Sequence, residues 1–402
     1  MMGRRIRARR MRSVREIMFA AAVLAIYAPA AHASLTDTLG PSSGTLVAAP
    51  FVFELQRTIS RATDFPATTT TPGFTYHYDP VLVSFERSST SLGPAFLERA
   101  DTVGQGRFDL GMSYLYADFV EKDGEDLDGL TEGLLFRNLG ILDGATVTFT
   151  KFDLTVQALY FSGTYGITDR WDVNLLVPLF HTSLDVDQRL TTLTFGTQRS
   201  SSSDDATGPG DLQLRTKYLL GRGDQLRYAA GFALRVPSGD EDDFQGIGDV
   251  TLTPSAVVSY LFGSNDAHLS LGFETNADDL ERSRVAYGTG VSLGLHERLT
   301  VNVDIIGTSQ FVDDDITIHV ADRPQDVSEG ARRFGSGVSI VPSDGGTDLI
   351  TTIDRIDNVD VTVGFKVNVY KTAVLFGSAI VPLTSDGIQA DVIPAGGVEV
   401  SF

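Results

Sequence analysis

The chain contains no cysteine and a single tryptophan, so a disulfide framework and thiol chemistry are excluded. Basic residues are scarce, because 32 Lys and Arg stand against 52 Asp and Glu, for a formal net charge of −20. Nucleic-acid binding needs a basic surface, so we expect no nucleic-acid partner. After one apolar stretch near the N-terminus, no further long hydrophobic run occurs. If the protein lies in a membrane, it must therefore cross it as a closed β-barrel.

The N-terminal 33 residues have the pattern of a secretory signal peptide. Residues 1–16 carry seven Arg against one Glu, Ile17–Ala28 is apolar, and Ala31-His32-Ala33 follows. A basic region, a short apolar core and an A-x-A site predict cleavage after Ala33, with Ala31 and Ala33 as the recognised residues. The core is much shorter than the roughly 20 apolar residues of a membrane anchor. Removal of residues 1–33 would leave 25 basic and 51 acidic residues, a net charge of −26.

The other end of the chain predicts the compartment. Apolar residues recur at every second position from Ile388 to Phe402, which is typical of a β-strand with one apolar face. Fifteen residues exceed the roughly 5–6 of a usual strand, and about 9–11 are enough to span a membrane. Such a strand resembles the last strand of Gram-negative outer-membrane barrels, in which the terminal Phe is part of the assembly signal. We therefore expect the barrel assembly machinery to act on Phe402.

The body of the chain repeats one unit of two alternating strands joined by a tight turn. Examples are Phe108–Tyr116, Trp171–Leu179 and Leu212–Leu220. Counting from Arg107 gives twelve strands, and a hairpin at 74–87 would make fourteen. The predicted fold is all-β, a transmembrane antiparallel up-and-down β-barrel over 73–402, with 34–72 as a periplasmic or plug segment. A soluble β-sandwich or solenoid is the alternative, although it would not explain a terminal Phe or segregated loop lengths.

Connection lengths separate into two classes that alternate along the chain. Outer-membrane barrels have short periplasmic turns and longer extracellular loops. If Phe402 ends in the periplasm, counting strands back from it places every short turn on the periplasmic side. The long acidic loops would then face lipopolysaccharide, which we expect as a partner together with outer-membrane lipid. Short turns lie at 168–169, 221–224, 263–266, 296–298 and 371–372, and long connections lie at 121–146, 182–209, 238–247 and 309–358.

Several motifs resemble those of the outer-membrane transporter family named for the meta-pathway of phenol degradation. They include Gly73-Phe74-Thr75-Tyr76, Gly104–Phe108 and Tyr165–Asp172. The resemblance implies a channel for small, often hydrophobic or aromatic, solutes, and it extends to FadL-type fourteen-strand barrels whose N-terminal segment plugs the lumen. The family supplies no defined binding residues. A non-conducting barrel with a structural or surface-interaction role is the alternative.

The polar face of each barrel strand points into the lumen, which yields a set of candidate lumen-lining residues. They could form a constriction in which a basic wall faces an acidic one, or they could pair and hold the barrel round. Small inward residues at 229–233 and 286–294 would admit either a plug, from 34–72 or 309–358, or a solute. The candidate lumen-lining residues are Asp109, Asp172, Arg215, Lys217, Arg227, Arg235, Glu274 and Glu399.

Signals for catalysis and metal binding are weak. The acidic clusters at 123–128, 240–243 and 313–315 lack the ligand spacing of an EF-hand. Two strand openings, Gly208-Pro209-Gly210-Asp211 and Gly246-Ile247-Gly248-Asp249, resemble phosphate loops but precede no helix. Among the histidines only His268 is expected to face the lumen within a strand. We therefore expect no enzymatic activity, catalytic residue, metal site or cofactor, and a small-molecule solute as the ligand.

Overall fold

A computed structural model describes most of the chain after residue 72. The predicted signal peptide, its cleavage residues Ala31 and Ala33, and residues 40–72 lie outside the described residues. No helix in the described part is long and apolar enough to cross a membrane. The described residues are 34–39, 73–79, 84–138, 141–192, 196–312, 314–320, 332–334, 338–343, 346–353 and 355–402.

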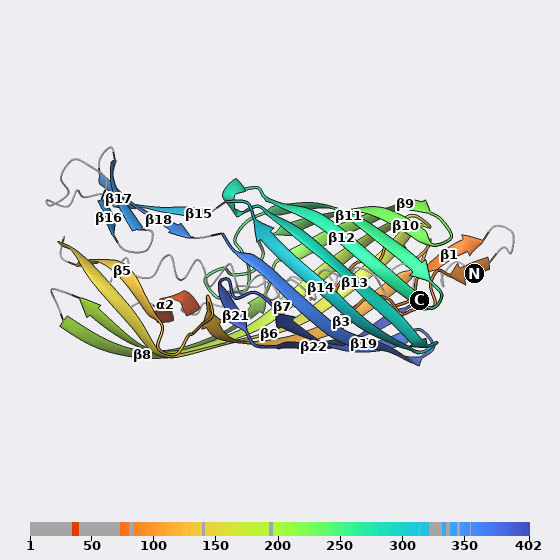
Figure 1. The fold of residues 1–402 in the computed structure, drawn as a ribbon, viewed down its shortest axis with the longest axis horizontal. Coiled ribbons are helices and arrows are strands. Elements are labelled where there is room, and N and C mark those ends of the chain that lie inside the picture. Colours follow the sequence, from red (N-terminus) through yellow and green to blue (C-terminus); the bar gives the residue numbers. More distant parts are fainter. Residues whose placement is uncertain are drawn as a thin grey trace, which may run out of the picture.

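Twelve of the described strands form one closed antiparallel barrel (Figure 1). Each wall strand pairs with the next one along the chain, and the last wall strand returns to the first. The predicted twelve-strand up-and-down barrel is therefore confirmed. The wall strands are β3 (Phe108–Lys122), β6 (Ile141–Thr168), β7 (Trp171–Thr192), β9 (Leu212–Arg222), β10 (Leu226–Val236), β11 (Thr251–Phe262), β12 (Asn265–Asn276), β13 (Arg284–His296), β14 (Leu299–Gln310), β19 (Asp357–Tyr370), β20 (Ala373–Pro382) and β22 (Ile393–Ser401).

The barrel closes where the C-terminus meets β3. Asp109 lies opposite Ser401 in the register of the two strands, and the Phe402 N–H donates to the Phe108 carbonyl at 2.8 Å. The prediction of one fifteen-residue terminal strand is wrong. Residues 388–390 form a separate short strand, β21 (Ile388–Ala390), which also pairs with β3. The remaining nine residues of β22 are still sufficient to span a membrane.

The hairpin that would have raised the count to fourteen is not part of the wall. It consists of β1 (Tyr76–Asp79) and β2 (Ser84–Arg87), which pair with each other in a separate two-stranded sheet. Residues 73–107 therefore precede the barrel wall, although the sequence placed them in the barrel domain.

The two ends of the barrel differ as predicted, and we call them the turn end and the loop end. The five predicted short turns join β6–β7, β9–β10, β11–β12, β13–β14 and β19–β20, at the end where the C-terminus lies (Figure 1). At the loop end, the described part of 309–358 forms a small sheet beyond the barrel (Figure 1). This sheet contains β15 (Asp314–Val320), β16 (Arg332–Phe334), β17 (Val338–Ser343) and β18 (Gly346–Ile353).

Two predicted loops, 121–146 and 182–209, are largely strand. β6 has 28 residues and β7 has 22, and they pair with each other. Three further strands extend this region: β4 (Glu125–Asp126) pairs with β3, β5 (Thr131–Asn138) with β6, and β8 (Gly196–Pro209) with β7. At about 3.3 Å per residue, 28 residues extend well beyond a hydrocarbon core of about 30 Å. The physical reason is that Leu184, Val186 and Leu190 continue the alternation of β7 and are buried on one face.

The outer face of the barrel is apolar. Large exposed side chains include Leu214 at 53% and Leu271 at 56%, which a soluble sandwich would bury. Aromatic rings gather near the turn end, where Phe108 and Tyr165 lie 4.5 Å apart. An apolar outer band flanked by aromatic rings is typical of a membrane barrel. The rings near this end are Phe108, Tyr165, Trp171, Tyr218, Tyr228, Tyr260, Phe262, Tyr370 and Phe402.

The inner face changes character along the barrel axis. Near the turn end, Asp109 on β3 and Asp172 on β7 are buried. Farther along the same strands, Phe119 and Leu184 occupy the equivalent inward positions and belong to one large apolar cluster. The short helix α2 (Leu35–Leu39) packs on β7 and β8 and contributes Leu35 and Leu39 to that cluster. The polar half and the apolar half of the lumen form the two parts of the candidate site.

Candidate functional site

Residues 88–103, which we call the plug, lie in the turn-end half of the lumen. Wall side chains accept hydrogen bonds from the plug backbone, which needs partners once it leaves water. The Leu92 N–H donates to Thr300 Oγ1 and the Ala100 N–H to Ser259 Oγ, each at 2.9 Å. The Val103 N–H donates to Asp172 Oδ2 at 2.9 Å. The candidate plug at 34–72 lies outside the described residues except for α2 and its neighbour Ser34.

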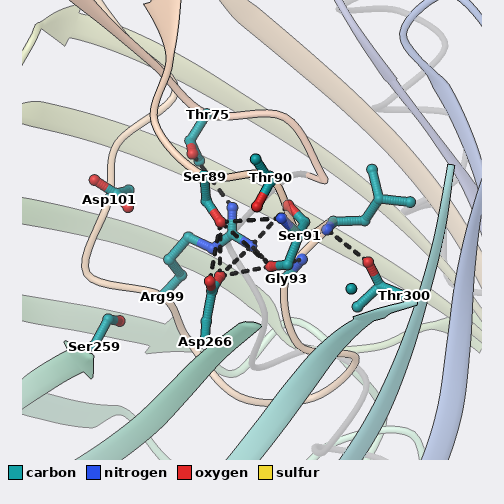
Figure 2. A network of polar contacts seen from close by, with 12 residues as sticks. Thr75, Ser89, Thr90, Ser91, Gly93, Arg99, Asp101, Ser259, Asp266 and Thr300 are labelled. Carbon is teal, nitrogen blue, oxygen red and sulfur yellow. Dashed lines mark hydrogen bonds and ion pairs between the residues drawn. The ribbon is translucent and has the colours of Figure 1, made fainter. Parts of the chain in front are cut away.

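A buried carboxylate on β12, Asp266, holds the middle of the plug (Figure 2). It accepts hydrogen bonds from Ser91 Oγ at 2.6 Å and Ser89 Oγ at 2.9 Å, and Arg99 Nη2 lies 3.2 Å from its Oδ2. Arg99 also donates to Thr75 Oγ1 at 3.3 Å. A buried ion pair is tolerated when further hydrogen bonds satisfy its remaining atoms, and here two hydroxyls do so for Asp266.

A second buried carboxylate, Asp101 of the plug, is held by the wall. Arg227 bonds to Asp101 Oδ2, and Arg222 Nη2 lies 3.2 Å from Oδ1. Arg227 also donates to the Ser88 carbonyl at 2.9 Å, and Lys217 Nζ donates to the Arg99 carbonyl at 2.9 Å. Arg227 and Lys217 therefore bind the plug, as does Asp172, and all three are predicted lumen-lining residues. Sequence reasoning missed Asp101, Arg99 and Asp266, because their partners lie more than a hundred residues away and no local pattern marks them.

The other predicted lumen residues are buried or half-buried, and most bond outside the predicted set. Asp109 accepts from Ser401 Oγ at 2.6 Å, across the barrel seam. Glu399 accepts from Lys366 Nζ and from the Gly73 N–H, both at 2.9 Å. These contacts favour the interpretation that the charges hold the structure together. Further contacts are Asp172 with Val103, Arg235 with Asp211 at 2.9 Å, Glu274 with Arg284 at 2.9 Å and Arg215 with Gln213.

A cavity of about 190 Å³ lies against the plug and the neighbouring wall. The plug contributes Phe96 and Leu97, and Gly231 and Ala233 of β10 leave space for it. Gly288 on β13 makes room for the plug, because a Cβ there would lie 2.3 Å from Leu97 Cδ2. The small inward residues therefore both admit the plug and bound a cavity. Arg215, Lys217, Arg235, Asp172 and Glu274 also line it.

At the loop end, residues 238–247 form a folded loop that we call the lid. The Asp211 carboxylate accepts backbone N–H donors from Ser238 at 3.1 Å, Gly239 at 3.0 Å and Ile247 at 2.9 Å. Its fourth donor is Arg235. The lid in turn binds α2, because Asp243 Oδ1 accepts from the Leu35 N–H at 2.9 Å.

The two Gly-x-Gly-Asp strand openings thus have a structural use. Asp211 of the first repeat holds the lid. Asp249 of the second accepts from Asn276 Nδ2 at 2.7 Å and from Arg282 Nη1 at 2.9 Å, which fixes the next loop-end connection. Each carboxylate therefore holds the loop that follows the neighbouring strand, and neither repeat opens a helix.

No group of three potential metal ligands occurs among the described residues, and Asp240 Oδ1 accepts from the N–H of Asp242 in its own loop at 3.0 Å.

Burial raises the pKa of Glu241 in the lid above its usual value, and Asp242 and Asp249 raise it further. His268 lies 3.0 Å from Ser259 Oγ, which also accepts from the plug, so this pair supports the plug.

The closed wall, the apolar outer band and the polar half-lumen define the class as a transmembrane β-barrel. By sequence, the model of a family described as "Putative MetA-pathway of phenol degradation" matches residues 137–332. This match confirms the resemblance predicted from the motifs, over a shorter range than 73–402. No curated protein matches the chain.

Three solved structures of bacterial proteins are similar to the chain over most of its length. An outer membrane channel from Pseudomonas putida F1 is 13% identical, with 75% of this chain and 98% of that chain covered and a TM-score of 0.44. A FadL homologue from Pseudomonas aeruginosa is 10% identical, with 74% and 90% covered and a TM-score of 0.32. The toluene transporter of Ralstonia pickettii is 13% identical, with 74% and 90% covered and a TM-score of 0.30.

Proposed function

We propose that the protein is an outer-membrane channel for passive uptake of small solutes, with single-ring aromatic compounds as the preferred class. The observation that carries the proposal is the cavity of about 190 Å³ inside a membrane-type barrel. An engineered protein cavity of about 150 Å³ is large enough to bind benzene. The apolar inner face at the loop end offers such a ring a continuous surface toward the cavity, because Phe96 and Leu97 belong to the same cluster. The description of the matching family also supports aromatic solutes.

We also propose that the protein has the location and the partners that the sequence predicts. Export by a cleaved signal peptide would deliver the chain to the Gram-negative outer membrane, where the assembly machinery would bind Phe402. The apolar outer band would contact lipid, and the extended loop end would contact lipopolysaccharide. The long β6 and β7 hairpin suits this environment, since it extends far beyond a bilayer core.

Passage through the barrel requires movement at both ends. The plug lies in the turn-end half of the lumen and lines the cavity, and the lid lies at the loop end. The plug is held by two buried ionic groups, whereas the lid is held mainly by Asp211. We infer that a solute reaches the cavity when the lid moves, and that release of the plug limits its passage.

Uptake by proteoliposomes tests the function. Liposomes containing the purified protein should take up phenol and toluene faster than protein-free liposomes and faster than they take up a pentose. Faster uptake of the sugar would overturn the aromatic preference. No protein-dependent uptake of any solute would instead favour a non-conducting structural barrel.

Charge selectivity is a separate test of the lumen residues. Arg215 lines the cavity, so Arg215→Glu should shift ion permeability in planar bilayers toward cations. An unchanged permeability ratio would show that Arg215 does not line the conducting path. Arg227→Glu is not an equivalent test, because it would place a second acid beside Asp101.

A further inference from the structure

Phe244, in the middle of the lid, has an unusual combination of backbone and environment. Its φ is +58°, in the left-handed region that bulky residues rarely adopt. Its side chain is 1% exposed and belongs to the loop-end apolar cluster. A non-glycine residue keeps such a conformation only when its surroundings hold it, and such residues occur often at ligand clamps and switches.

The surroundings that hold Phe244 are specific. The Phe244 N–H donates to the Glu241 carbonyl at 3.1 Å, and the Gln245 N–H donates to the Asp240 carbonyl at 2.8 Å, which closes a tight turn at Phe244. Asp211 binds both ends of the lid, because its carboxylate accepts from the backbone N–H groups of Ser238, Gly239 and Ile247. The lid therefore presses one aromatic ring into the inner face of the barrel mouth.

The cluster that receives this ring is continuous with the cavity. It contains Phe244 and α2 residue Leu39 at the loop end, and Phe96 and Leu97 at the cavity. The next residue along the chain carries a buried polar atom: the side chain of Gln245 is 3% exposed, and its Nε2 has no hydrogen-bond acceptor among the described residues. Buried N–H donors of this kind usually have a partner. The site thus offers one ring-sized apolar place and one N–H donor.

We propose that the place filled by Phe244 is a binding site for a single aromatic ring, in which the side chain of Phe244 stands in for the solute. A solute binds by displacing this ring and relieving the left-handed conformation, and a hydroxyl on the ring accepts from Gln245 Nε2. The site rests on the proposed channel function and names its first binding step at the loop end. Phe244 is then the residue that keeps the mouth closed when no solute is present.

Removal of the ring tests the proposal, because the apparent affinity of a site falls by the fraction of molecules in which it is accessible. Phe244→Gly removes the ring and suits a positive φ. Calorimetric titration of the detergent-solubilised full chain with phenol should give at least tenfold tighter binding than the unsubstituted chain. Phe311→Gly is the matched control, since Phe311 is a loop-end phenylalanine that is 56% exposed. This control should leave the affinity unchanged.

Two further measurements keep the result decisive. If Phe244→Gly fails the gel-mobility test for a folded barrel, Phe244→Asn replaces it, because Asn tolerates the left-handed region. The unsubstituted chain should bind phenol more tightly than toluene, because only phenol can accept from Gln245 Nε2. The Gln245→Leu variant should bind the two solutes equally. Unchanged phenol affinity in a folded Phe244 variant, with uptake intact in the unsubstituted chain, would overturn this site and leave the channel standing. Absence of uptake in the unsubstituted chain would overturn the channel itself.

Discussion

The plug at one end of the lumen and the lid at the other are held by different physical means. At the turn end, the plug is fixed by buried charges, and Asp266 and Asp101 each bind at least one Arg. At the loop end, the lid is fixed by backbone N–H groups on Asp211 and by the packing of Phe244. Ionic groups buried away from water are costly to separate, whereas an apolar contact can be replaced by an apolar solute. The difference indicates a durable closure at one end and an exchangeable one at the other.

The largest effect is expected at Asp266. Asp266→Asn removes the negative charge and leaves Arg99 buried without it, so the free energy of unfolding should fall by about 3–5 kcal/mol. Denaturant unfolding of the folded barrel measures this change. Arg355→Ala is the control, because Arg355 is 57% exposed in its pair with Asp357 and surface pairs contribute about 0–1 kcal/mol. Equal losses in the two variants would contradict an ionic closure at the turn end.

Asp211→Asn should have a smaller effect that is confined to the lid. Hydrogen bonds to a charged group contribute about 1.5–3 kcal/mol, so the open population of the lid should rise by roughly tenfold or more. Cleavage at Glu241 by a Glu-specific protease measures the opening. Asp249→Asn is the matched control from the second repeat, and it should not accelerate cleavage at Glu241. Equal acceleration would show that Asp211 does not hold the lid specifically.

Gly246→Ala should loosen the lid by a smaller amount. A Cβ at Gly246 would lie 2.6 Å from Asp211 Oδ1, and overpacking of this kind costs about 1 kcal/mol or more. Gly272→Ala is the control, because its nearest contact would be at 3.4 Å. The same protease assay compares the Gly246→Ala and Gly272→Ala variants. Unchanged cleavage in the Gly246→Ala variant would contradict close packing of the lid backbone around Asp211.

The smallest effect is a dependence on pH. The pKa of Glu241 is raised in the closed lid by burial and by Asp242 and Asp249, so the closed lid binds the proton more tightly than the open lid. Closure should therefore be strongest below about pH 4.5 and weaken as pH rises through the raised pKa. Hydrogen exchange of the Ile247 amide, corrected for the intrinsic rate, measures this, and Glu241→Gln should remove it. Protection of the Ile247 amide that increases with pH would contradict the role of protonated Glu241 in closing the lid.

The barrel was readable from the sequence because membrane strands repeat one local pattern. Alternation at positions such as Trp171–Leu179 and the segregation of turn lengths located twelve wall strands and their direction. The extension of β7 was missed although Leu184, Val186 and Leu190 carried the same signal, because the acidic residues between them resembled a solvated loop. Those acids alternate with the apolar residues, as a two-faced strand requires.

The plug and the lid were not readable in the same way. Asp266 was part of a predicted short turn, and its partners Ser91 and Arg99 lie 175 and 167 residues away, where no local period connects them. Arg227 was predicted as a lumen residue from its face alone, but its partner Asp101 depends on the path of the plug. The Gly-x-Gly-Asp repeats were recognised as strand openings, whereas the hydrogen bonds that Asp211 accepts from the lid appear only in three dimensions.

Tethering the plug and the lid in turn separates their roles in uptake and binding, and a chain without native cysteine permits it. One cysteine pair, Leu92→Cys with Thr300→Cys, fixes the plug to the wall, and another, Leu212→Cys with Ser238→Cys, fixes the lid. Oxidation of the plug pair should abolish phenol uptake but leave phenol binding intact, whereas oxidation of the lid pair should abolish both. Reduction should restore each activity. Undiminished uptake with the plug tethered would contradict plug release as the limiting step. Undiminished binding with the lid tethered would contradict entry of the solute through the lid.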